Sequence, residues 1–148
     1  MNESALQQFA VLGSPISHSQ SPMLYQVAAR LLTLNWNYAA IELEAAELAQ
    51  FIESADYSWR GFSLTMPLKE AVLPLLTTVD DVAKMTGSVN TLWWDIREGN
   101  RCWHGINTDV YGIVRALAAG GVAQCEQVLI LGSGATARSA VIAVAQLG

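Results

Sequence analysis

Residues 9–32 decide the fold, and they read FAVLGSPISHSQSPMLYQVAARLL. Residues 9–12 are a short apolar run of strand length, and the turn residues 13–15 close it. Pro22 suits the first turn of a helix, and apolar residues recur at helical spacing after it. The residues predicted to face inward are Leu24, Val27, Ala28, Leu31 and Leu32. This stretch therefore predicts one strand followed by one helix.

The same alternation continues through residue 106. Further strands are predicted over residues 36–43 and 60–65, and further helices over residues 45–55 and 67–76. Residues 88–97 and 101–106 are strand-like and flank a short turn, which predicts a hairpin. The sequence thus predicts an α/β fold with flanking helices and an open sheet that is mostly parallel, with an antiparallel exception.

The pattern restarts after residue 107. Residues 110–119 predict a helix that could link two lobes. Residues 127–131 then predict a buried strand, residues 132–134 a glycine turn, and residues 135–147 an apolar helix. This order is typical of the first β-α unit of a Rossmann-type lobe.

Length and composition narrow the choice of function. The chain has 148 residues, of which 52% are hydrophobic and 14% charged, and this suits about one domain with its own core. A net charge of -5 argues against binding nucleic acid or an anionic membrane by long-range attraction. Cys102 and Cys125 lack partners at ligand spacing, so we predict no metal site and a reducing compartment. Polar residues and prolines interrupt the uncharged residues 4–29, which predicts neither a membrane span nor a signal peptide.

Ser19 and Ser21 lie where the first predicted strand leads into the first helix. A structural role would explain them, because serine is a good N-cap and Pro22 a good first helical residue. A helix N-terminus with two hydroxyls is also suited to binding a carboxylate. Both roles can hold together.

Lys69 and Asp109 form a second candidate cluster. Lys69 falls in the first turn of a predicted helix, where the helix dipole disfavours a cation, so a role in proton transfer would explain its position. The ordinary alternative is an exposed, solvated lysine. Thr108 or Asp109 would serve as an N-cap, and Asp109 could instead pair with Lys69 if their loops meet at one edge of the sheet. Asn90, within a predicted strand, needs polar partners in a neighbouring loop or on a ligand.

Residues 132–137 read GSGATA and follow a predicted strand, as a dinucleotide-binding fingerprint does. The third glycine position holds Ala137, which is an accepted variant. A plain strand-turn-helix connection is the alternative. His18 and His104 have no acidic residue at useful spacing, and we interpret both as structural or pocket-lining.

Together these stretches resemble the shikimate dehydrogenase family over essentially the whole chain. The matching segments are residues 13–22 (GSPISHSQSP), 65–69 (TMPLK), 87–92 (GSVNTL), 107–109 (NTD) and the glycine turn at 132–134. The resemblance implies a cytoplasmic, NADP-dependent oxidoreductase of chorismate and aromatic amino-acid biosynthesis. Its small-molecule substrate would be 3-dehydroshikimate, which it would reduce to shikimate.

The resemblance also implies a role for each site residue. Lys69 and Asp109 would be catalytic, Ser19 and Ser21 would hold the substrate carboxylate, and Thr65, Asn90 and Asp109 would hold its hydroxyls. NADP would lie against Gly132, Ser133, Gly134 and Ala135. The chain departs from the family at Ser63, Val110 and Ala135, where the family often has Asn, Gly and Gly. The first change would reshape one substrate hydrogen bond, and the last would alter how closely the pyrophosphate approaches.

The resemblance divides the chain into two parts. Residues 1–107 would be the substrate-binding catalytic domain, and residues 108–148 a linker helix with the truncated start of the dinucleotide-binding domain. Because the family's cofactor lobe is longer, we expect the chain to be a fragment that is inactive alone. The alternatives are a quinate/shikimate dehydrogenase of broader specificity and a shikimate-binding module without redox activity. The preference for NADP over NAD, and association into a homodimer, stay open.

Overall fold

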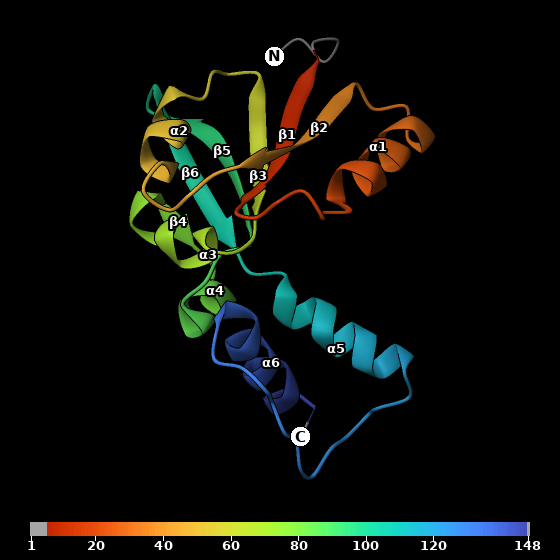
Figure 1. Ribbon diagram of the computed structural model, residues 1–148. Helices are drawn as coiled ribbons and strands as arrows, with labels where there is room; N and C mark the ends of the chain where they lie inside the picture. The colour runs from red at the N-terminus through yellow and green to blue at the C-terminus, as the bar shows by residue number, and fades with distance from the viewer. Residues whose placement is uncertain (1–5, 148) are drawn as a thin grey trace.

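A computed structural model describes residues 6–147, and six strands of this part form one sheet in the order β2-β1-β3-β5-β6-β4 (Figure 1). The strands are β1 (Gln7–Gly13), β2 (Trp36–Glu42), β3 (Trp59–Leu64), β4 (Thr78–Val79), β5 (Thr91–Arg97) and β6 (Asn100–Ile106). β5 pairs antiparallel with β3 and β6, whereas the other neighbours pair in parallel, so β5 alone runs against the rest. The predicted α/β fold, with a mostly parallel sheet and an antiparallel exception, is confirmed.

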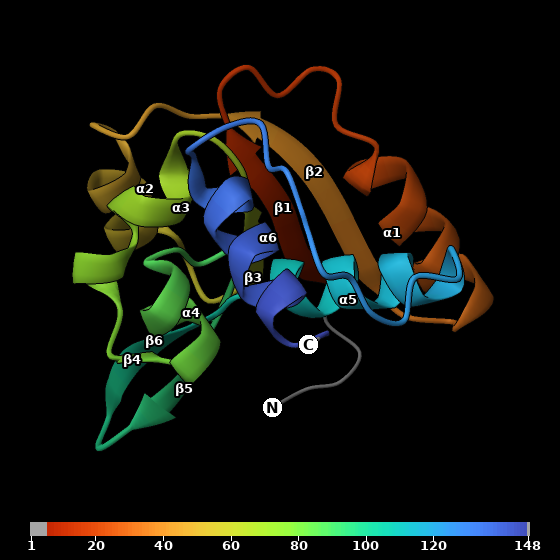
Figure 2. The same ribbon diagram turned by 90° about the horizontal axis from the view of Figure 1, so that it is seen from below.

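Helices flank this sheet on both sides and at one end. The helices are α1 (Ser21–Leu31), α2 (Leu48–Ser54), α3 (Leu68–Ala71), α4 (Asp81–Thr86), α5 (Asp109–Ala119) and α6 (Ala135–Ala145). Seen from below, α1 lies beside β2 on one side, α2 and α3 lie on the other, and α5 and α6 cross beneath the sheet (Figure 2). The carboxyl ends of the parallel strands therefore point toward α5 and α6.

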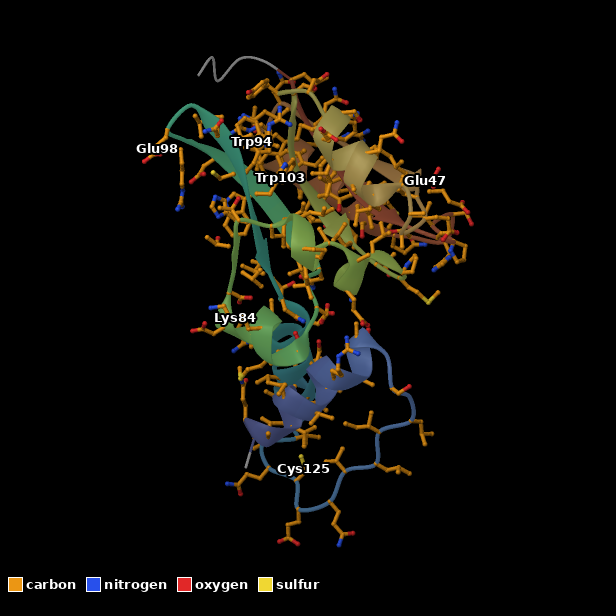
Figure 3. The ribbon with its side chains drawn as sticks, turned by 90° about the vertical axis from the view of Figure 1, so that its left-hand side faces the viewer. Glu47, Lys84, Trp94, Glu98, Trp103 and Cys125 are labelled. Carbon is orange, nitrogen blue, oxygen red and sulfur yellow. The ribbon has the colours of Figure 1, made fainter. Side chains whose placement is uncertain are left out.

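The main core lies between the sheet and the side that carries α2 and α3. Alternate residues of β1 point to opposite faces, so Leu12 joins this core while Val11 joins a smaller cluster near α1. Trp94 and Trp103 face each other across the β5-β6 hairpin and are both buried in the main core (Figure 3). A fully buried leucine such as Leu68 contributes about 1.5–3 kcal/mol, so this core fixes the sheet edge from which the site is built.

The orientation predicted for the first helix is wrong. Leu24, Val27, Leu31 and Leu32 are 49–79% exposed, and Ala29 is the buried residue of α1. Tyr25 stacks on Tyr38 of β2, with ring centroids 4.2 Å apart, and this contact turns the Tyr25 and Ala29 side toward the sheet. Apolar residues occupy several sides of α1, so their spacing alone did not indicate the packed side.

The helix predicted over residues 67–76 is shorter than expected. α3 is a single turn, and a 3-10 turn follows it over Leu73–Leu75. Pro74 explains the break, because proline lacks the backbone N–H and its ring clashes with the preceding turn of an α-helix. Two short elements were missed. β4 pairs with β6, and α4 lies between Asp80, whose carboxylate accepts from the Ala83 N–H, and Gly87 in the left-handed conformation.

The strand predicted over residues 127–131 does not form. These residues have no regular structure, and Leu129 and Leu131 are 84% and 88% exposed. A buried parallel strand needs a neighbour for its backbone hydrogen bonds, and no strand within residues 6–147 lies beside this segment. The following helix does form as α6 and packs against α5.

Candidate active site

A polar pocket of about 280 Å³ lies where β1 and β3 end and β5 begins. Six residues singled out from the sequence line it, namely Ser19, Ser21, Thr65, Lys69, Asn90 and Asp109. They come from four separate stretches of chain, which the sheet brings to one edge because parallel strands end there and the reversed β5 starts there.

Lys69 and Asp109 form an ion pair in this pocket. Lys69 Nζ lies 2.6 Å from Asp109 Oδ2, and the two side chains are only 14% and 22% exposed. The alternative of a solvated lysine is therefore wrong. Since α3 is one turn long, the helix-dipole argument for Lys69 loses most of its force, and the Asp109 carboxylate is its dominant electrostatic neighbour.

Of the two N-caps that the sequence allowed, the structure has Thr108 and not Asp109. Thr108 makes no side-chain cap bond, and Asp109 is the first residue of α5. Its backbone N–H donates to Asn107 Oδ1 at 2.9 Å, so Asn107 satisfies this helix end and leaves the Asp109 carboxylate for the pocket.

Asn90 holds the Asp109 carboxylate from the other side. Its Nδ2 donates to Asp109 Oδ1 at 2.6 Å, so the two carboxylate oxygens have different partners. Asn90 Oδ1 accepts from the Thr108 backbone N–H and from the Thr91 hydroxyl. Of the two partners that the sequence left open, a neighbouring loop or a ligand, the loop is the one observed.

The two serines of the first loop do not cap α1. Gln20 is the N-cap and makes no side-chain cap bond, while Ser21 is the first helical residue. Ser19 Oγ accepts from the Ser21 N–H at 3.3 Å, and both side chains line the pocket. Their hydroxyls are therefore placed to donate hydrogen bonds to a ligand.

Gly13 lets the first loop approach the loop that carries Thr65. The Ser14 N–H donates to Met66 O at 2.9 Å and the Thr65 N–H to Leu12 O at 2.9 Å. A Cβ at Gly13 would collide with Thr65 Cγ2 and lie 2.7 Å from Met66 O. Only glycine allows this approach, which brings the Ser19–Ser21 region and Thr65 to the same pocket.

A second cleft, of about 480 Å³, adjoins the pocket and separates α3 from the start of α6. Thr65 and Lys69 line both hollows, and Gly134 and Ala135 line the far side of the cleft. Gly132 has a φ of +133°, a backbone conformation that favours glycine, and a Cβ on Gly134 would meet no protein atom within 4 Å. Gly132 and Ser133 precede the cleft and do not line it. This turn leaves room for a phosphate group against the backbone at the start of α6.

Contacts that the sequence did not predict fix α6 in place. Arg138 Nη2 pairs with Glu70 Oε1 at 2.8 Å, and Arg138 Nε donates to Thr86 O at 2.6 Å. Asn107 Nδ2, buried next to Ser88, donates to Ser139 Oγ at 3.1 Å. The position of Asn107 within the NTD motif was the one signal for this network.

The two histidines differ in position. His18 is exposed and lines the pocket. His104 is buried and does not line the pocket. His104 lies 2.6 Å from Thr78 Oγ1 and 2.9 Å from Asp95 Oδ1, and the hydrogen bond from His104 holds the pKa of Asp95 below its usual value. Sequence spacing missed this acidic partner, which lies diagonally across the β5-β6 hairpin.

Within residues 6–147 there is no cluster of three His, Cys, Asp or Glu side chains that could hold a metal ion. The helices of the same part are all too short or too polar to cross a membrane. Fold and side-chain geometry together define an α/β domain with a polar pocket at its sheet edge, next to a cleft that the glycine turn before α6 lines.

Comparison with known proteins identifies the family. The model of the shikimate dehydrogenase substrate binding domain matches residues 11–92. Shikimate dehydrogenase (NADP(+)) of Syntrophobacter fumaroxidans is 40% identical over 132 residues, which are 88% of this chain and 44% of that protein. The chain belongs to the shikimate dehydrogenase family, and it spans about half the length of the curated relatives it matches.

Solved structures agree with this assignment. Shikimate 5-dehydrogenase of Thermus thermophilus in complex with shikimate is 37% identical, with a TM-score of 0.86 over 96% of this chain and 53% of that one. The same enzyme has been solved with both NADP(H) and shikimate. Shikimate dehydrogenase of Aquifex aeolicus is 32% identical, with a TM-score of 0.89 over 100% of this chain and 55% of that one.

Proposed function

We propose that this chain forms the substrate-binding half of an NADP-dependent shikimate dehydrogenase, which reduces 3-dehydroshikimate to shikimate. The observation that carries the proposal is the Lys69–Asp109 pair, joined at 2.6 Å in a hydroxyl-lined pocket that opens beside the glycine turn. The relatives are named shikimate dehydrogenase (NADP(+)), and one of them has been solved with NADP(H) and shikimate.

The pocket suits a small hydroxy acid. Ser19 and Ser21 would donate hydrogen bonds to the substrate carboxylate from the start of α1. Thr65, Asn90 and Asp109 would hold the ring hydroxyls, because an amide and a carboxylate provide both donors and acceptors for them. Because the carboxylate and the hydroxyls would each be held by their own group of residues, the ring would bind in one direction.

Reduction of a carbonyl adds a hydride to its carbon and a proton to its oxygen. NADP, in its reduced form, supplies that hydride. Lys69 would donate the proton from Nζ to the carbonyl oxygen, and Asp109 would hold the lysine side chain in place. In the reverse direction, Lys69 would remove the proton from the same hydroxyl oxygen.

Gly132, Ser133, Gly134 and Ala135 would hold the cofactor's phosphates at the start of α6. The open space at Gly134 and the position of Ala135 on the cleft support this assignment. We further propose residues 1–107 as the substrate-binding catalytic domain and residues 108–148 as the linker and first part of the dinucleotide-binding domain. α5 begins at Asp109, which supports that boundary.

The location and assembly are also proposals. Cys102 and Cys125 are both free thiols, which supports a reducing compartment such as the cytoplasm. Exposed apolar side chains on α1 and in residues 127–131 support association into a homodimer, and light scattering would detect it.

Isothermal titration calorimetry of this chain with shikimate tests the proposed function. We expect shikimate to bind, and Asp109→Asn to weaken that binding. Asp81→Asn is the matched control, because Asp81 forms an exposed pair with Lys84 on α4 and does not line the pocket. Shikimate binding that is absent from the folded wild-type chain, or that is unaffected by Asp109→Asn, would contradict the proposal.

A further inference from the structure

Ser63 lines the polar pocket and is not among the residues assigned above to the substrate. It lies on β3 beside Val11 of β1 and Thr91 of β5, so its hydroxyl is part of the pocket floor. A serine hydroxyl rotates freely unless a partner fixes it, whereas an asparagine amide has two donors in a fixed plane. Ser63 therefore needs a partner if it is to present its hydrogen in one direction.

Tyr38 of β2 is that partner. Its hydroxyl donates to Ser63 Oγ at 2.7 Å. The phenol of β2 thus reaches across β1 to the pocket floor on β3. Within residues 6–147, Ser63 has no other recorded side-chain partner, so its own hydrogen remains available to a ligand.

The ring of Tyr38 is held rigidly. It is 5% exposed and stacks on Tyr25, with the two ring planes within 2° of parallel. Its apolar side lines a separate cavity of about 200 Å³ that also contains Phe9 and Trp36. Tyr25 and Ser63 line both hollows, so they form the wall between the apolar cavity and the polar pocket.

We propose that Tyr38 is a positioning residue for substrate binding. It does not contact the substrate, and it orients the Ser63 hydroxyl so that Ser63 donates a hydrogen bond to a substrate oxygen. This inference rests on the proposed function. Tyr38 does not line the polar pocket and would not touch the substrate, so its effect must pass through Ser63.

A double-mutant cycle on the shikimate dissociation constant tests this role. Loss of one neutral hydrogen bond predicts that Tyr38→Phe and Ser63→Ala each weaken binding about 2- to 12-fold. Because Tyr38 acts mainly through Ser63, the double variant should bind nearly as well as Ser63→Ala alone. Tyr57→Phe is the matched control, because Tyr57 is exposed and lines a different hollow, and it should bind like the wild type.

A second readout needs no ligand. Carbon-13 labelling at Cζ of tyrosine reports the hydrogen bonding of each phenol, and Ser63→Ala should shift the Tyr38 resonance while leaving that of Tyr57 unchanged. An unshifted Tyr38 resonance would overturn the proposal, as would Tyr38→Phe binding shikimate with wild-type affinity. Either result would leave the proposed function standing. A folded wild-type chain that binds no shikimate would overturn the proposed function, and this inference with it.

Discussion

The Asp109 carboxylate has a partner for each of its oxygens, Lys69 on one side and Asn90 on the other. An ion pair with little exposure loses solvation, and removing one partner leaves the other charge poorly compensated. Lys69 thus has a structural effect that is separate from any role in proton transfer, and the two can be measured separately.

Lys69→Ala should lower the free energy of unfolding by about 1–3 kcal/mol, because it leaves the Asp109 carboxylate without its cation in a partly buried site. Lys84→Ala is the matched control. Its pair with Asp81 is largely exposed, so we expect a loss of less than about 1 kcal/mol. Urea denaturation measures both, and equal losses would contradict a special environment for Lys69.

The catalytic role of Lys69 is tested by turnover. In a chain of the relatives' full length that carries this sequence, Lys69→Ala should reduce kcat about 10²- to 10⁴-fold, because proton transfer typically contributes that much. The Michaelis constant for shikimate should change much less. A variant that loses affinity but keeps its kcat would show that Lys69 only binds the substrate.

Burial raises the pKa of Tyr38 to about 12, although its hydrogen bond to Ser63 partly opposes this effect. Because the pKa is raised in the folded state, the stability from the neutral phenol is complete below pH 10 and is lost as the pH rises toward 12. A shift of two units corresponds to about 3 kcal/mol. Tyr38→Phe should flatten the decline in unfolding free energy between pH 10 and 12, and urea titrations that give the same slope for both proteins would refute this.

Individual site residues were predictable because their motifs are local. The TMPLK and NTD stretches indicated Lys69 and Asp109, and the rule that ligands bind at the carboxyl edge of an open sheet indicated where the two could pair if their loops met. The partner of His104 was not predictable, because Asp95 reaches it across a hairpin whose register the sequence does not specify. The Tyr38 contact with Ser63 was missed for the same reason, since it spans β1 between β2 and β3.

At the scale of elements, the approach of two loops shapes the pocket. Gly13→Ala should cost about 1–3 kcal/mol of stability, because its Cβ would press on Thr65 and on the Met66 carbonyl. It should also weaken shikimate binding. Gly112→Ala in α5 is the control, since its Cβ would meet nothing and alanine stabilises a helix by about 0.5–1 kcal/mol. Thermal unfolding distinguishes these opposite signs, and a neutral Gly13→Ala would contradict the close approach.

The helices and strands were predictable where the hydrophobic periodicity and the turn or capping residues indicated the same element. β1, β2 and the β5-β6 hairpin followed from alternation and turn residues, whereas Pro74 ended α3 earlier than the apolar period indicated. The packed side of α1 depended on the fit of Tyr25 and Ala29 against β2, which no helical period specifies. The segment at residues 127–131 has a strand-like sequence without a neighbouring strand, and neighbours decide whether such a segment pairs.

At the scale of the whole molecule, buried polar contacts join α6 to the first unit. Asn107 donates a hydrogen bond to Ser139. Arg138 forms an ion pair with Glu70 and donates a hydrogen bond to the Thr86 carbonyl. These contacts hold the glycine turn opposite Lys69, so they set the width of the cleft.

Arg138→Met should therefore loosen α6 without disturbing the sheet. We expect faster hydrogen exchange at the amides of α6, with β1 and β3 unchanged, because the variant loses its pair with Glu70 and its bond to Thr86 O. Arg115→Met, on the exposed side of α5, is the control. Equal protection of α6 in both variants would show that apolar packing on α5 holds it.

We propose that the pocket holds shikimate in one orientation, with its carboxylate at Ser19 and Ser21 and a ring hydroxyl beside the Lys69–Asp109 pair. A crystal structure of this chain with shikimate tests it most directly. We predict hydrogen bonds from both serines to the carboxylate and one ring oxygen within hydrogen-bonding distance of Lys69 Nζ. Shikimate bound elsewhere, or with its carboxylate at Lys69, would contradict the account.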